Sequence, residues 1–155
     1  AFEPMPTNAV RLRHNLSTNV PSVRWRVAEL ALDDEDGSGC LSVESDDFGE
    51  GNDALATDGD LTIDVRRGES LIDEGTYPVP DVLKVDVEGA ELRVLRGLAD
   101  RLDEVRVVYV ELHHELSGDY DTSTAEIEAF LRDHGFSVER LNERSDAYHV
   151  RASRA

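Results

Sequence analysis

Three carboxylates gather at one predicted junction between a strand and a helix. Asp86 ends an apolar run, Glu88 follows it, and Glu91 falls in the first turn of a helix predicted to begin near Ala90. Open α/β sheets bind their ligands at the carboxyl ends of strands, and the helix dipole favours an anion in the first turn. The cluster therefore indicates a ligand or proton-transfer site, although two of these acids could equally be solvated side chains of an acidic protein.

Two histidines follow the next predicted strand. His113 and His114 come after the apolar run 105–112, which contains Glu111 near its end. An imidazole titrates close to neutral pH, so His113 is a candidate general base. A metal site with Asp86 or Glu111 is a further possibility, but no second spacing of His or Cys supports one. Histidines of a solvent-facing loop are the plainer interpretation.

A third candidate lies at the start of the chain. The segment 1–3 is typical of the tail of a strand, and it ends in Glu3 just before Pro4. In doubly wound nucleotide-binding folds, an acidic residue at the end of the second strand binds the ribose hydroxyls. The two oxygens of a carboxylate match two vicinal hydroxyl donors, so Glu3 is a possible ribose ligand. A nicotinamide dinucleotide-binding domain would use such an acid as well.

The central acids need a strand, a turn and a helix to hold them. Residues 82–87 are nearly all apolar and β-branched, which predicts a strand covered on both faces. A charged residue in such a strand is costly unless it is paired, so Lys84 is expected to hold a nearby carboxylate. Gly89 permits a sharp turn. The helix that follows has the apolar stripe Leu92, Val94, Leu95, Leu98 and Leu102.

The rest of the chain alternates between helical and strand patterns. We expect a helix with Thr7 as its N-cap, a strand within 22–32, a loop over 33–39, and short strands over 40–44 and 61–65 that form a hairpin. A helical turn is expected over 70–74. A buried strand follows over 105–112, then a helix that opens on a capping box of Ser123 and Glu126. The strands 136–141 and 147–152 should pair antiparallel at the edge of a sheet.

The segments LKVDVEGAELRVLRG and AFEPMPTNAVRLRHNL together resemble the FkbM-type methyltransferases, which use S-adenosylmethionine. The resemblance implies an α/β class I methyltransferase fold with a Rossmann-like, doubly wound sheet. It further implies a single domain over 1–155 with a β-rich insertion over 39–67. Glu3 would bind the ribose, Ala31 and Leu32 would border the adenine, and Asp86 would lie beside the methyl donor or acceptor. Glu88 or His113 would be the base.

The family's first strand and its glycine-rich turn precede the AFEP segment and have no counterpart in this sequence. The glycines at 49–53 do not replace that turn, because no apolar strand leads into them. In the family's strand order, 3-2-1-4-5-7-6, the missing strand is the middle one. The resemblance therefore implies a chain truncated before the second strand, as a fragment of a longer reading frame or one half of a split protein.

The function implied is methyl transfer from S-adenosylmethionine to a hydroxyl of a sugar or another small metabolite. The alternative is a non-catalytic remnant or accessory subunit that keeps the outer parts of the fold. A nicotinamide dinucleotide-binding domain leaves the DVEGAE junction unexplained and ranks below both. The sequence leaves the oligomeric state open.

The composition indicates which partners and which cellular environment to expect. The chain of 155 residues has a formal net charge of −18, which argues against binding to nucleic acid or to anionic membranes. Its acids are dispersed and Lys84 is its single lysine, a pattern typical of a halophilic archaeon, where salt screens the repulsion. Cys40 stands alone, which predicts a reducing compartment, the cytoplasm. We find neither a membrane-spanning apolar run nor a signal peptide.

Overall fold

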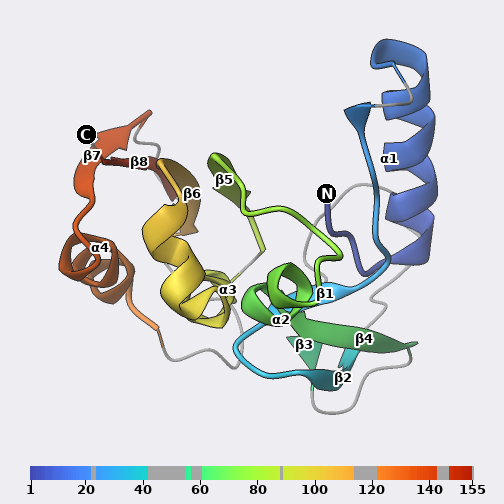
Figure 1. Ribbon diagram of the computed structural model, residues 1–155, viewed down its shortest axis with the longest axis horizontal. Helices are drawn as coiled ribbons and strands as arrows, with labels where there is room; N and C mark the ends of the chain where they lie inside the picture. The colour runs from blue at the N-terminus through green and yellow to red at the C-terminus, as the bar shows by residue number, and fades with distance from the viewer. Residues whose placement is uncertain are drawn as a thin grey trace.

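The computed structural model describes residues 1–21, 24–41, 55–56, 61–87, 89–113, 122–142 and 147–154, and every structural statement below concerns these residues. The elements in chain order are α1 (Pro6–Asn19), β1 (Ala31–Asp33), β2 (Gly37–Leu41), β3 (Leu55–Ala56), β4 (Leu61–Arg67), α2 (Gly68–Asp73), β5 (Val82–Val85), α3 (Glu91–Gly97), a 3₁₀ helix (Ala99–Glu104), β6 (Val107–His113), α4 (Thr124–Asp133), β7 (Ser137–Leu141) and β8 (Ala147–Ser153). The strands form two four-stranded sheets (Figure 1).

The C-terminal sheet has the strand order β5-β6-β8-β7. Strand β5 runs parallel to β6, while β8 is antiparallel to both of its neighbours. The predicted antiparallel pair at the end of the chain is therefore confirmed, with β7 at the edge. This order equals the 4-5-7-6 half of the order that the sequence resemblance implied.

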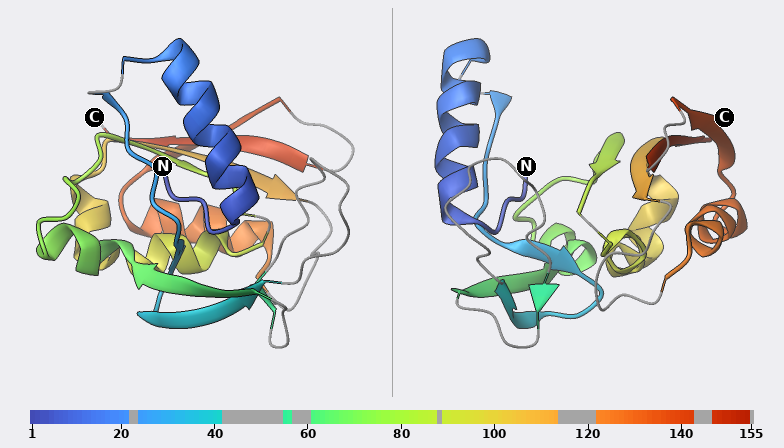
Figure 2. Two further views of the ribbon diagram at one scale, coloured as in Figure 1. Left: turned by 90° about the vertical axis from the view of Figure 1, so that its right-hand side faces the viewer. Right: turned by 180° about the vertical axis from the view of Figure 1, so that it is seen from behind.

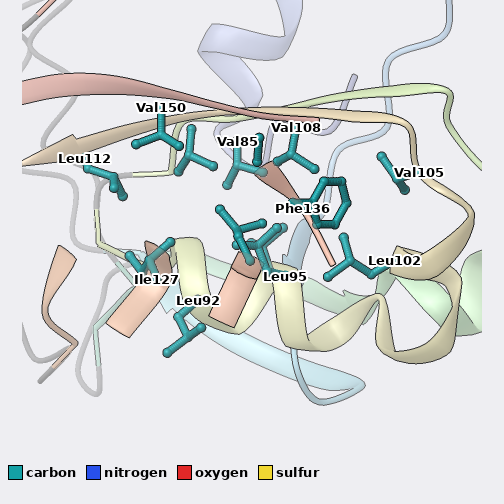
Figure 3. Close-up of a cluster of buried hydrophobic side chains, with 14 of the residues drawn as sticks. Val85, Leu92, Leu95, Leu102, Val105, Val108, Leu112, Ile127, Phe136 and Val150 are labelled. Atoms are coloured by element: carbon teal, nitrogen blue, oxygen red, sulfur yellow. The ribbon is translucent and has the colours of Figure 1, made fainter. Parts of the chain in front are cut away.

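Helices α3 and α4 cover one face of this sheet and enclose the main core (Figure 3). Side chains alternate along β6, so that Val108, Val110 and Leu112 are buried while the residues between them are not. The core also contains the predicted apolar stripe of α3: Leu92, Val94, Leu95, Leu98 and Leu102 are all buried. The stripe is confirmed because a helical period is a local property of the sequence.

The opposite face of the sheet is partly exposed. Val82 on β5 keeps 53% of its surface accessible and Tyr109 on β6 keeps 37%. The prediction that residues 82–87 are covered on both faces is therefore wrong. Both helices that follow these strands pack on the same side, and in the described part of the chain the other side of β5 faces solvent (Figure 2).

The second sheet contains the predicted hairpin. Strands β2 and β4 pair antiparallel over Gly37–Leu41, so the hairpin is present but begins earlier than residue 40. The predicted loop 33–39 is wrong at both ends, because β1 includes Asp33 and β2 includes Gly37. Residues 42–44 of the predicted strand lie outside the described residues.

The strand predicted within 22–32 is realised only in part. Phe2 forms an isolated parallel bridge with Ala28, and regular pairing begins only at β1, which runs parallel to β4. The short N-terminal segment offers a partner only around Ala28: Glu3 N donates to the Ala28 carbonyl, and Ala28 N donates to the Ala1 carbonyl, both at 3.0 Å. A strand pattern without a paired neighbour stays irregular.

Two helix ends test the capping predictions. Ser123 caps α4 as predicted: its hydroxyl accepts from Glu126 N at 3.3 Å, and the Glu126 carboxylate accepts from Ser123 N at 2.8 Å. The Thr7 prediction is wrong, because α1 begins at Pro6 with Met5 as its N-cap. Proline is favoured in the first turn, where its missing N–H costs no hydrogen bond.

Helix α3 also contacts the end of β1, where Gly97 lies against the backbone of Asp33. A Cβ atom placed on Gly97 would stand 1.9 Å from the Asp33 carbonyl oxygen. Arg93 clamps the same junction, with its guanidinium 2.7 Å from Asp33 Oδ1 and 3.1 Å from Asp34 Oδ1. Asp33 is only 1% exposed, and burial, together with a hydrogen bond to the Asp34 side chain, raises its pKa to about 6. The clamp joins the N-terminal sheet to the main core.

Within the described ranges, none of the helices has both the length and the apolar character needed to cross a bilayer.

Candidate functional site

The register of β5 and β6 brings acids from two strands to one place. Val85 lies opposite Val110 in this parallel pair, and the next residue along the chain is an acid in each case, Asp86 directly after β5 and Glu111 within β6. Both follow a buried valine, so the alternation of side chains directs them to the exposed face of the sheet. They lie at the carboxyl end of β5 and near that of β6, where α/β sheets bind ligands.

Asp86 is the nearby carboxylate with which Lys84 pairs. The Lys84 ammonium contacts Asp86 Oδ2, and the two side chains retain 63% and 36% of their exposure, respectively. A pair as accessible as this one contributes only about 0–1 kcal/mol. The sequence argument that a carboxylate on this strand bears a large burial cost does not hold, because this face is open to solvent.

Glu91 differs from Asp86, although both belong to the predicted carboxylate cluster. It is 4% exposed, and its Oε1 accepts a hydrogen bond from Gly89 N at 3.0 Å. Gly89 itself adopts a positive φ of 105°, which a glycine tolerates without strain. Glu91 therefore stabilises the turn into α3. Glu88, the candidate base between them, lies outside the described residues.

Glu3 is fixed by the chain that surrounds it. Its Oε1 accepts a hydrogen bond from Met5 N at 2.8 Å, at the entry to α1, and its backbone pairs with Ala28. The ribose role that the resemblance implies for Glu3 stays a prediction.

The two candidate adenine contacts lie in different surroundings. Ala31 is 8% exposed and belongs to a small core with Met5, Leu41, Ile63 and Val65. Leu32 is half-buried and packs against the main core. Both side chains thus pack against other described residues, and their contact with an adenine stays a prediction.

His113 ends β6 opposite Ala147 of β8 and is half-buried. It lies two residues beyond Glu111, on the same face of the sheet. His114 falls outside the described residues. Among the residues that the structure describes, no group of three His, Cys, Asp or Glu side chains is placed to hold a metal ion.

Sequence reasoning missed a further residue on this face, His149. It is the cross-strand partner of Glu111, and its Nε2 lies 3.3 Å from Glu111 Oε2. The signal that could have revealed it is the alternation of β8, where Tyr148 and Val150 are buried and His149 between them is not. The site therefore combines Asp86, Glu111, His113 and His149 on one open sheet face, an arrangement able to accept a proton and to bind polar groups.

Comparison with known proteins matches residues 1–138 to the family model described as the methyltransferase FkbM domain. Hexuronic acid methyltransferase AglP of Haloferax volcanii is 39% identical over 114 residues, which cover 73% of this chain and 46% of that protein. The 2-O-methyltransferase NoeI of Sinorhizobium fredii is 27% identical over 128 residues, covering 71% of this chain and 51% of the relative.

A solved structure of methyltransferase FkbM from Methylobacillus flagellatus superposes on 97% of this chain and 35% of its own, with a TM-score of 0.64 and 16% sequence identity. That likeness establishes the fold, a mixed α/β arrangement in agreement with the predicted class. The chain spans about half of the length of AglP and of NoeI.

Proposed function

Because the chain belongs to the methyltransferase FkbM domain family, we propose that its full-length gene product transfers a methyl group from S-adenosylmethionine to a hydroxyl group of a sugar or a related small metabolite. The family match over residues 1–138 is the observation that carries this proposal. The names of two relatives support the acceptor class, since one is a hexuronic acid methyltransferase and the other is a 2-O-methyltransferase. The dispersed acids and single lysine fit a halophilic archaeal source, and AglP comes from such an organism.

The donor set of the chain fits S-adenosylmethionine in chemical type. The cofactor supplies an activated methyl group on a positively charged sulfur, together with ribose hydroxyls and an ammonium group. Glu3 and Asp86 offer carboxylate oxygens that suit hydroxyl donors and cations. Glu3 would bind the ribose, Asp86 would lie beside the reacting groups, and Ala31 and Leu32 would border the adenine.

The chain's own contribution to the reaction would be orientation and proton transfer. Holding the acceptor in line with the methyl group lowers the entropic part of the barrier. A positioned carboxylate or imidazole can then take the hydroxyl proton. Glu88 and His113 are the candidates for this base that the sequence offered. The cytoplasmic location inferred from the lone Cys40 stays a prediction, as does the absence of nucleic acid and membrane partners.

Methyl transfer can be tested on the full-length gene product in concentrated potassium chloride. S-adenosylmethionine with a deuterated methyl group is supplied with a hexuronic acid glycoside, and the product is analysed by mass spectrometry. We expect the label on a sugar oxygen, and no label when the matched acceptor lacks that hydroxyl. A folded protein that labels none of a panel of hexuronic and neutral sugars would exclude sugar O-methylation and favour the non-catalytic alternative.

A further inference from the structure

The pair formed by Glu111 and His149 lies on the exposed face of the C-terminal sheet. The two residues are direct cross-strand partners on β6 and β8, with 20% and 26% of their side chains exposed. Their closest atoms, Glu111 Oε2 and His149 Nε2, are 3.3 Å apart. Contacts of catalytic groups are often this long in the free protein and tighten when substrate binds.

The other ring nitrogen of His149 indicates which tautomer this geometry favours. Nδ1 is buried and has no hydrogen-bond partner in the described part of the chain. A buried N–H without an acceptor is costly, whereas a lone pair in the same place is tolerated more easily. The arrangement therefore favours a ring proton on Nε2, the nitrogen that lies 3.3 Å from Glu111 Oε2. In the free protein the two groups are in contact without a hydrogen bond, and the bond would form if the contact tightens when substrate binds.

The charged neighbours of Glu111 are largely committed to other partners. Lys84 of β5 is paired with Asp86. Arg151, two residues after His149 on β8, lies 3.8 Å from the Glu139 carboxylate of β7. His113 lies on the same strand and face, and Leu141 of β7 faces His149. Within the described ranges, the Glu111 carboxylate accepts no hydrogen bond, and His149 is its contact among charged or titratable groups. It thus retains oxygen atoms that can accept a donor from a bound molecule.

From this arrangement we infer that Glu111 takes the proton from the acceptor hydroxyl, and that His149 is a positioning residue for it. The inference rests on the proposed function. As the hydroxyl oxygen bonds to the methyl carbon, the carbon–sulfur bond breaks and its electron pair remains on sulfur, which becomes a neutral thioether. The hydroxyl proton passes to the Glu111 carboxylate, which later releases it to water. Glu111 lies beside Asp86 at the carboxyl ends of the strands, where the acceptor would be bound.

The proposal predicts a defined loss of turnover in the Glu111→Gln variant of the full-length gene product. Glutamine keeps an oxygen for the His149 N–H but does not accept the proton, so kcat should fall about 100-fold or more. Binding of S-adenosylhomocysteine and the urea midpoint of unfolding should not change. Glu139→Gln, a matched carboxylate on the same face, should behave like the wild type in every measurement.

Two substitutions of His149, one that keeps an N–H donor and one that removes it, test its positioning role. His149→Gln retains a side-chain N–H donor and should preserve more of kcat than His149→Ala, with the same KM for the sugar. A wild-type kcat in Glu111→Gln would overturn the base assignment. Equal losses in the two His149 variants would overturn the positioning role.

One readout does not depend on activity. Nitrogen-15 chemical shifts of the His149 ring should show the proton on Nε2 in the wild type, and a shift of the proton population towards Nδ1 in Glu111→Leu. A ring protonated on Nδ1 in the wild type would contradict the proposed pair. If no sugar is methylated by the wild type, the proposed function fails, while this measurement still decides whether His149 and Glu111 interact as described.

Discussion

The Gly97→Ala variant is expected to lose about 3 kcal/mol of unfolding free energy, the upper end of the cost of overpacking a core site. Its new methyl carbon would stand 1.9 Å from the Asp33 carbonyl oxygen and 2.8 Å from the carbonyl carbon, both of which are backbone atoms. A flexible side chain could move aside, but here β1 must separate from α3. That movement would also stretch the ion pairs that Arg93 makes with Asp33 and Asp34.

Urea unfolding at high salt measures this effect, with Gly37→Ala as the matched control. Gly37 begins β2, and a methyl group added there would meet nothing within 4 Å, so its substitution should change stability by no more than about 0.5 kcal/mol. A Gly97→Ala protein that unfolds at the wild-type urea concentration would show that α3 does not approach β1 as described.

The second large effect is expected at Glu128, a buried carboxylate of α4 that is 4% exposed. It accepts hydrogen bonds from Arg132 at 2.7 Å, from Arg140 at 2.7 Å and from the Tyr148 hydroxyl at 3.0 Å. Removing one partner of a fully buried pair costs about 3–5 kcal/mol. Both arginine side chains are about half exposed, so solvent screening reduces their share. We expect Glu128→Gln to cost about 2 kcal/mol at pH 7.

The pH dependence of this loss distinguishes a charged network from simple packing. Burial by itself raises the pKa of Glu128, but the hydrogen bonds from Arg132, Arg140 and Tyr148 outweigh it and lower the pKa below the ordinary 4.5. A carboxyl with a depressed pKa in the folded state stabilises the protein above its unfolded pKa. That stabilisation disappears as the pH falls through the folded pKa.

Urea unfolding at a series of pH values should therefore show the largest gap between wild type and Glu128→Gln near neutrality, and a shrinking gap below about pH 4.5. The exposed Glu104, paired with Arg101, provides the control, since Glu104→Gln should change little at any pH. A gap of constant size from neutral to strongly acidic pH would mean that the charge of Glu128 contributes nothing.

Local features of the fold could be predicted from the sequence. The capping box of α4 depends on two residues three positions apart, and the stripe of α3 on a helical period; both are confirmed. The exposure of Val82 could not be predicted, because it depends on which side the helices pack. The irregular chain over residues 25–27 also depends on tertiary structure, since a strand pattern needs a neighbour to pair with.

In the candidate site, too, some contacts could be predicted from the sequence and others could not. The sequence predicted that Lys84 holds a nearby carboxylate, and the structure shows that this carboxylate is Asp86, two residues further along the chain. The contact between Glu111 and His149 depends on the register of β6 against β8, two strands separated by a helix and a further strand, so spacing alone does not reveal it. Glu91 is similar, because its burial against the Gly89 turn is a result of packing.

The most direct test of the account is whether Glu3 of this chain helps to bind the cofactor. Calorimetric titration of the full-length gene product with S-adenosylhomocysteine compares the wild type with Glu3→Gln, which keeps one oxygen for Met5 N but loses the second carboxylate acceptor. Glu29→Gln, at an exposed partner of Arg13, is the control. We predict binding to the wild type and the control, and about tenfold weaker binding to Glu3→Gln, a loss of about 1.4 kcal/mol. Equal affinity of all three proteins would remove Glu3 from the site, and a folded wild type that does not bind would contradict the proposed use of S-adenosylmethionine.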